Sequence, residues 1–440
     1  MPRAPDEHTV PNHPTGSNFP EERITSTFPE GGFQAWATVA GAFIVLFCGF
    51  GYTSSFGVYQ DFYTREYLSE SSASAISWVG SVNALLLIAF GLITGRFYDR
   101  GYFYHLLYGG SLLLSFSLFM LSFCNLPGPI FLVQGLSAGL GTGMTYLPSL
   151  TVVSHYFQKC RALAMTIVSS GAGLGSVVHP IMLNNMFKSL GFATAVRASA
   201  GLVSTLLLVA CMMMRSRLPP SATHLPFSKS LRRFAYDKAY VLATAGLTTY
   251  VVRYYFPLFY LQLDAIQHGI NQNLAFYSLV IMNSASVVGR LAPGLFTRRF
   301  EIIDMAVVAS GFGATLILSM IALKTVASVV IIAVLYGFFS GVCEGSVKLL
   351  MLAVLTEDLG ELGLRIGVAF TFVGIGGLIG PPIDGALLTD KFMWWRPALF
   401  SAIMAFVGVA FFVATLIVVK RRNAEKLKAL DGEKTAVEAK

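Results

Sequence analysis

The sequence predicts an all-α membrane protein whose twelve transmembrane helices form two six-helix halves. Of its 440 residues, 55% are hydrophobic and 12% are charged, and the mean hydropathy is +0.65. In a soluble domain about 25% of the residues are charged. A helix crosses a bilayer with roughly 20 apolar residues. Twelve such runs begin near Ala35, Ile76, Tyr104, Ile130, Leu163, Arg197, Ala239, Ala275, Ile303, Val326, Gly367 and Pro397.

A polar segment divides the twelve runs into two sets of six. Residues 215–238 read "RSRLPPSATHLPFSKSLRRFAYDK" between the sixth and seventh runs, and we predict that they form a basic cytosolic linker. The N-terminal half then covers residues 35–214 and the C-terminal half covers residues 239–419. Many secondary transporters consist of two such halves around a midplane site, because one half can rock against the other.

Both ends of the chain lack the long apolar runs. Residues 1–34 are rich in Pro, acidic and small polar residues, which predicts a disordered cytosolic tail and not a cleavable signal. Residues 420–440 are predicted to form a cytosolic C-terminal tail. In this orientation the cytosolic segments carry 22 Lys and Arg residues and the opposite loops carry six, as the positive-inside rule requires. A basic surface on anionic lipid explains the net charge of +8 without nucleic acid.

A short turn between the second and third runs reads "GRFYDRG" and has the composition of a gate. Gly95 permits the close approach of another helix. Asp99 can pair with Arg100 or with a helix end in one conformation and release it in another. We predict that Gly95, Asp99 and Arg100 form a gate; the alternative is a solvated turn.

Three ionisable residues lie deep inside apolar runs: Arg253 in the seventh, Arg290 in the eighth and Glu344 in the tenth. A charge near the bilayer centre costs about 2.5–3.5 kcal/mol on insertion scales, so each should face a cavity or a partner. Arg290 has no acid within one turn of its own helix. Its counter-charge is therefore expected on another helix or on a ligand.

The other two charges have structural alternatives. Glu344 can pair with Lys348, which follows one turn later on the same helical face. Arg253 can extend toward the outer surface beside Tyr254 and the neighbouring tyrosines. In the functional interpretation, Arg253 holds an anion, or pairs with Glu344 when the site is empty.

Two further ionisable residues lie toward the outer side. His179 precedes Pro180 in the fifth run; it is either a neutral histidine hydrogen-bonded between helices or a titratable proton carrier. Asp384 is near the outer end of its run and is expected to be solvated. Glu344 and His179 are therefore the candidates for proton coupling.

Residues for covalent or metal chemistry are dispersed along the chain. The five cysteines have no paired spacing, and the sequence contains neither HExxH nor CxxC. We therefore predict no enzymatic activity, no metal and no cofactor.

Six segments of the chain stand out together: "PEGGFQAW", "SSFGVYQDFY", "GRFYDRG", "YFQKCRALAM", "FYSLVIMNSASVVGR" and "GPPIDGALL". With them the chain resembles the major facilitator superfamily and, within it, fungal members of the monocarboxylate porter branch. The resemblance covers nearly all of residues 30–418.

The resemblance implies twelve helices, alternating access, and a cavity lined by spans 1, 4, 7 and 10 with spans 2, 5, 8 and 11 at the seam. It also implies that Arg290 faces a substrate carboxylate, which a guanidinium binds bidentately. The sequence departs from the animal carriers at Ser286, where they have an acid, and in "SSFG", where Phe56 stands in place of a lysine. The family's proton and lactate machinery is thus incomplete here.

We expect a secondary transporter for a small organic anion or a carboxylate-bearing metabolite, such as an exported fungal secondary metabolite, with proton coupling. The alternatives are an uptake carrier for a monocarboxylate or vitamin, and a ligand sensor that does not transport. The expected setting is the plasma membrane, with lipid and protons as partners and a functional monomer. The candidate substrate-binding residues are Arg290, Arg253, Glu344, Tyr254, Tyr52 and Asn83.

Overall fold

The computed structural model describes residues 29–68, 73–217, 227–297, 299–356, 361–388 and 393–438, and in this part of the chain every regular element is a helix. Spans 1–6 follow in chain order. They are α1 (Phe33–Cys48) with α2 (Phe50–Thr53), α3 (Phe56–Phe62) and η1 (Tyr63–Tyr67); α4 (Ala73–Ala89) with α5 (Gly91–Asp99); α6 (Phe103–Leu121); α7 (Pro127–Ile130) with η2 (Phe131–Ser137), α8 (Ala138–Thr151) and η3 (Val152–His155); α9 (Arg161–Leu190); and α10 (Phe192–Met213).

The second half repeats the plan after a short helix, α11 (Phe227–Tyr236), in the predicted linker. Its spans are α12 (Lys238–Gln267); α13 (Gln272–Phe296); α14 (Ile302–Ser319) with η4 (Met320–Ala322); α15 (Val326–Val342) with η5 (Cys343–Val347) and α16 (Lys348–Val354); α17 (Leu362–Leu388); and α18 (Trp395–Glu438). Each predicted run lies in a helix that starts within about five residues of the predicted position. Helix α18 continues through most of the segment predicted as a tail, and residues 1–28 of the N-terminal tail lie outside the described residues.

Eleven helical segments among the described residues are long and apolar enough to cross a membrane. Helix α12 is not one of them. Its 30 residues are sufficient in length, but Arg253 and several Tyr and Thr residues lower its hydropathy. It packs against α17 and α18 as part of the C-terminal bundle. The predicted all-α membrane fold of about twelve helices is confirmed.

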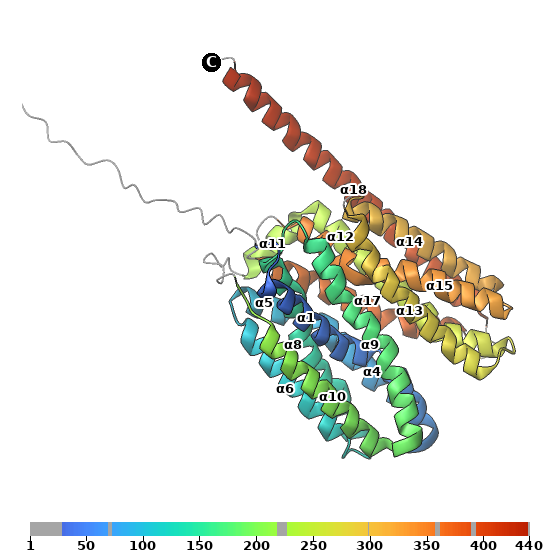
Figure 1. Ribbon diagram of the computed structural model, residues 1–440. Coiled ribbons are helices and arrows are strands. Elements are labelled where there is room, and N and C mark those ends of the chain that lie inside the picture. Colours follow the sequence, from blue (N-terminus) through green and yellow to red (C-terminus); the bar gives the residue numbers. More distant parts are fainter. Residues whose placement is uncertain are drawn as a thin grey trace, which may run out of the picture.

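The two halves meet at one end of the bundle and diverge at the other (Figure 1). We call the first the tail end, because Glu30, α11 and the projecting part of α18 lie there, and the second the far end. The halves touch mainly along two pairs of spans, α9 with α13 and α4–α5 with α17. An ideal Cβ at Gly95 would lie 2.2 Å from the carbonyl oxygen of Gly363. Glycine at this position therefore lets α5 and α17 touch backbone to backbone.

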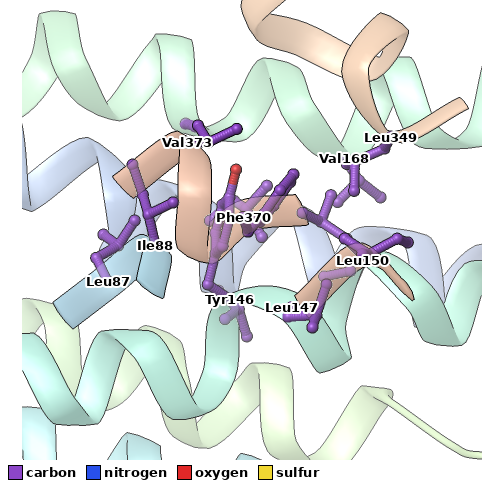
Figure 2. Close-up of a cluster of buried hydrophobic side chains, with 14 of the residues drawn as sticks. Leu87, Ile88, Tyr146, Leu147, Leu150, Val168, Leu349, Phe370 and Val373 are labelled. Atoms are coloured by element: carbon purple, nitrogen blue, oxygen red, sulfur yellow. The ribbon is translucent and has the colours of Figure 1, made fainter. Parts of the chain in front are cut away.

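An apolar layer joins the two halves near the tail end, and Figure 2 shows its side chains interlocking. Leu147 and Leu150 follow Tyr146 toward the tail end in α8, and Leu349 follows Lys348 in α16. Each fully buried aliphatic side chain contributes about 1.5–3 kcal/mol relative to water, so the layer opposes separation of the halves at this end. Its buried residues include Leu87, Ile88, Tyr146, Leu147, Leu150, Val168, Leu349, Phe370 and Val373.

Glu30 fastens the start of the first span to the connection between α8 and α9. Its carboxylate accepts hydrogen bonds from the backbone N–H groups of Gln158 (2.8 Å), Lys159 (2.6 Å) and Cys160 (3.1 Å). Burial raises the pKa of the Glu30 carboxyl, but these three donors and the Lys159 charge lower it by more, and the pKa lies below its usual value. Two segments that carried the family resemblance are thus in direct contact.

Candidate functional site

Arg290 extends from α13 of the C-terminal half to the N-terminal half. The residue is buried, with 4% of its surface exposed. Its Nη1 donates to the carbonyl oxygen of Ser169 in α9 at 3.3 Å, and its Nε donates to Oγ of Ser286 at 3.4 Å. Its guanidinium carbon lies 5.8 Å from the ring centroid of Phe50 in α2. Both hydrogen bonds are long, so a better acceptor can compete for the guanidinium.

Glu344 and Lys348 form a buried ion pair in span 10, which is the structural alternative considered for Glu344. The pair lies at η5, a π-helical turn in which Gly345 departs from helical geometry with ψ −127°. Such turns recur at functional sites. The Lys348 ammonium also lies 5.7 Å from the ring centroid of Phe370 in α17.

Aromatic rings from both halves surround these charges. Tyr146 of α8 stacks between Phe50 and Phe370, with ring centroids 5.9 and 6.1 Å away. The charges of Arg290, Glu344 and Lys348 act on the Tyr146 hydroxyl, and those of Arg290 and Glu344 act on the Tyr254 hydroxyl of α12. Spans 4, 7, 8, 10 and 11 thus meet in one place. We call Arg290, Glu344, Lys348, Tyr146, Tyr254 and Phe370 the central cluster.

Arg253 lies elsewhere in the C-terminal half. Its guanidinium carbon is 4.2 Å from the ring centroid of Tyr250, and its Nη1 would be 2.6 Å from a Cβ at Gly313 in α14. Arg253 is 1% exposed, so the alternative in which it extends to the outer surface does not hold. In this structure Glu344 pairs with Lys348, and the pairing of Arg253 with Glu344 in an empty site stays a prediction. Among the described residues, the three guanidinium nitrogens of Arg253 have no hydrogen-bond partner.

His179 and Tyr52 lie in helix contacts of the N-terminal half. His179 is fully buried, and its Nε2 is 3.2 Å from the carbonyl oxygen of Phe47. This geometry is the one expected of a histidine hydrogen-bonded between helices. The Tyr52 hydroxyl is 3.1 Å from Oγ of Ser199 in α10 and also bonds to the hydroxyl of Tyr59. Both side chains therefore belong to the packing of this half.

Asn83 lines a small pocket inside the N-terminal half. Its amide group donates to the carbonyl oxygen of Gln134 at 2.7 Å and accepts from Thr53 at 2.9 Å. These bonds link spans 1, 2 and 4. The residues that line the pocket are Gly49, Tyr52, Thr53, Phe56, Asn83, Leu114, Leu118, Gln134, Ala138 and Thr142.

At the tail end Asp99 caps the first turn of α17. Its carboxylate accepts hydrogen bonds from the backbone N–H groups of Gly363 (3.1 Å) and Leu364 (2.7 Å). A carboxylate at a helix N-terminus is favoured by the free N–H groups and the helix dipole. Of the two partners that the sequence allowed for Asp99, the structure has the helix end. Arg100 is exposed beside it.

The position of Asp384 contradicts the expectation that this residue is solvated. Although it stands near the end of α17, it is fully buried rather than solvated. Its Oδ1 accepts a hydrogen bond from Oγ of Ser401 in α18 at 2.9 Å. Position in an apolar run cannot predict such burial, because it depends on how a distant helix packs.

From the sequence, Lys348 was expected only as a partner for Glu344, and Tyr146 and Phe370 were not among the predicted site residues. Lys348 was detectable as a third cation inside an apolar run. The two aromatic residues were not, because aromatic side chains inside spans are common and only the fold brings spans 4 and 11 together.

Comparison with known proteins agrees with this architecture. Residues 39–359 match the family model of the Major Facilitator Superfamily. The Aspyridones efflux protein apdF of Emericella nidulans is 38% identical over 90% of this chain and 81% of its own length. The Agnestins efflux protein AgnL12 of Paecilomyces divaricatus is 32% identical over 94% of this chain and 95% of its own. The Major Facilitator Superfamily transporter FucP, solved in the outward conformation, shares the fold with a TM-score of 0.65 at 14% identity, covering 86% of this chain and 98% of FucP. The chain therefore belongs to the Major Facilitator Superfamily and is a membrane transporter.

Proposed function

We propose that the protein exports a small carboxylate-bearing metabolite by proton-linked alternating access. In this proposal it lies in the plasma membrane as a monomer of the monocarboxylate porter type, with the tail end in the cytosol. The observation that carries the proposal is the central cluster, in which Arg290 and Lys348 of one half meet Tyr146 of the other. A ligand held there contacts both halves, as alternating access requires.

The charges of the central cluster favour an anion. Arg290 and Lys348 supply two positive charges and Glu344 one negative charge, so one positive charge is left in a buried, low-dielectric place. A carboxylate relieves this imbalance and binds the planar guanidinium through two hydrogen bonds. Arg253, Tyr52 and Asn83 lie outside the cluster, and the proposal gives them no contact with the substrate.

The rings beside the charges favour a partly aromatic substrate. The ring centroids of Tyr146 and Phe370 are 6.1 Å apart, and those of Tyr254 and Tyr255 are 5.2 Å apart. Aromatic side chains bind planar apolar groups through offset or edge contacts. The two similar proteins described above are named as efflux proteins, which supports export as the direction and a secondary metabolite as the substrate.

Proton coupling is the remaining part of the proposal. Glu344 and His179 were its candidates from the sequence, and both are buried in the structure. A substrate carboxylate that binds Lys348 displaces Glu344, which then binds a proton to remain buried without a counter-charge. His179 already has a backbone partner and is the weaker of the two candidates.

The proposal is tested in liposomes that contain the purified protein and a pH-sensitive dye. Small carboxylates and aromatic carboxylates are added one at a time, and entry of radiolabel is measured in parallel. We expect a labelled carboxylate to cross together with protons. Arg290→Gln should abolish transport, whereas Arg299→Gln, which changes an exposed arginine at the tail end, should not. A ligand that binds but never crosses would identify a sensor instead.

A further inference from the structure

Asp384 is a buried acid that the central cluster does not use. It is fully buried in α17, and its Oδ2 has no hydrogen-bond partner among the described residues. Taking an ionised carboxylate out of water without a counter-charge is so costly that the group becomes neutral instead. The residue stands four positions before the end of α17 at Leu388, and the dipole of a helix C-terminus adds to the cost of a negative charge.

Within the part of the chain that the structure describes, the groups around Asp384 supply no positive charge. Helix α12 presents Tyr260, whose hydroxyl would lie 2.9 Å from a Cβ at Gly385 and which senses the Asp384 charge. Helix α18 presents the neutral hydroxyl of Ser401. The guanidinium of Arg396, near the start of α18, lies 5.5 Å from the Trp395 ring centroid. Lys391 falls outside the described residues.

A row of polar side chains leads from the far end to this acid. Tyr260, Asp264 and His268 follow one another at four-residue intervals, so they share one face of the last turns of α12. His268 Nδ1 lies 3.1 Å from Oδ1 of Asp264, and the His268 side chain is 33% exposed. The face therefore begins in solvent and ends beside Asp384. Protons can pass along such groups in short steps.

Glu344 differs from Asp384 in the charge that faces it. Lys348 pairs with Glu344, and this cation stabilises the ionised carboxylate. Glu344 takes a proton only after a substrate displaces it. No described cation faces Asp384 in this way, so its neutral form is the one that these surroundings favour before any substrate arrives.

We propose that Asp384 is a proton-binding site of this transporter, loaded from the far end along Tyr260, Asp264 and His268. The inference rests on the proposed proton-linked transport for its role in the cycle. The binding of the proton itself does not depend on a substrate.

Infrared spectroscopy of the full-length protein in lipid, without substrate, tests the site directly. A protonated carboxyl in an apolar place has a carbonyl stretch separate from that of the amides. We expect one such band at neutral pH, its loss as the pH is raised, and its absence in Asp384→Asn. It should persist in Asp304→Asn, which changes an acid paired with Lys420 at the tail end, and in Glu344→Gln. Ser401→Ala keeps the acid but removes its hydrogen bond, so it should shift the band.

Two results would overturn the inference. One is the absence of any carboxyl carbonyl band that disappears as the pH is raised. The other is a band that persists in Asp384→Asn and does not move in Ser401→Ala. If the Asp384→Asn variant does not fold, Ser401→Ala becomes the test: a shifted carbonyl band supports the proton site, and an unmoved band refutes it. If no labelled carboxylate crosses the membrane in the transport assay, the proposed function is refuted, but the proton-binding site at Asp384 is not. In a functional transporter, Asp384→Asn should still exchange labelled substrate across the membrane but lose accumulation driven by a pH gradient.

Discussion

At the scale of single residues, the protein keeps several ionisable groups inside the bundle, and their surroundings give each a different role. Arg290 bridges the halves, Glu344 and Lys348 neutralise one another, and Arg253 lies on a tyrosine ring. The sequence predicted that Arg253, Arg290 and Glu344 are deep in the membrane, because an apolar run makes them conspicuous, but it did not predict the burial of Asp384. The i to i+4 spacing gave Lys348 as a possible partner for Glu344. The contact of Arg290 with Ser169 could not be predicted, because a distant helix supplies it.

The Glu344–Lys348 pair predicts a non-additive effect on stability. Glu344→Gln alone leaves Lys348 buried without a counter-charge and should lower the unfolding free energy by about 3–5 kcal/mol. Glu344→Gln with Lys348→Met removes both charges and should restore most of that loss. Thermal unfolding in detergent measures both variants. Asp304→Asn breaks a partly exposed pair with Lys420 and should change stability by at most about 1 kcal/mol. A double variant no more stable than Glu344→Gln alone would contradict the pairing.

Arg253→Met is predicted to stabilise the protein slightly. The buried cation costs about 2.5–3.5 kcal/mol, and its contact with the Tyr250 ring returns about 0.5–2 kcal/mol. Met fills a similar volume without a charge, so the melting temperature should rise. Arg197→Met is a suitable comparison, since Arg197 also stacks on a ring, that of Phe123, but lies in α10. A clear drop in the melting temperature of Arg253→Met would show that a group neutralises this arginine.

At the scale of helices and connections, the apolar runs located every span to within a few residues, but they did not predict the internal irregularities. The π-helical turn at Cys343–Val347 and the break at Gly345 arise where span 10 packs on α13 and α14. Hydropathy does not reveal such turns, because the same residues form an apolar run whether the helix is regular or not. The turn places Glu344 in the central cluster, so the least predictable element is also part of the site.

The cap on α17 predicts local loosening in Asp99→Asn. The variant weakens the bonds to the amides of Gly363 and Leu364, and a helix cap contributes about 1 kcal/mol. Hydrogen exchange of these amides should accelerate by roughly fivefold, with little change elsewhere in α17. Asp304→Asn serves as the control. Unchanged exchange at Gly363 and Leu364 would contradict the cap.

The Glu30 contact predicts a stability difference that depends on pH. The pKa of this carboxyl is lower in the folded state than in the unfolded state. Its contribution to stability is therefore present above the unfolded pKa and is lost as the pH falls through the folded pKa. At neutral pH, Glu30→Gln should melt at a lower temperature than the unchanged protein, and the difference should vanish in acid. A difference that stays constant over this range would contradict the role of the charge.

At the scale of the whole molecule, the halves are closed at the tail end by the apolar layer and the Asp99 cap, and they diverge toward the far end (Figure 1). The sequence predicted two halves from the position of the linker. It did not predict which ends meet, because small residues occur at contacts within each half as well as between them. In the proposed function, transport requires the halves to separate at the tail end.

A reversible cross-link between the halves tests this claim most directly. An ideal Cβ at Gly374 of α17 lies 3.2 Å from Cβ of Ala89 in α4, close to the separation of about 3.5–4.5 Å found in disulfides. In liposomes, the double variant Ala89→Cys with Gly374→Cys should stop transporting labelled substrate when oxidised and recover when reduced. The two single variants should be unaffected by either treatment. Undiminished transport by fully cross-linked protein would contradict alternating access through the tail end.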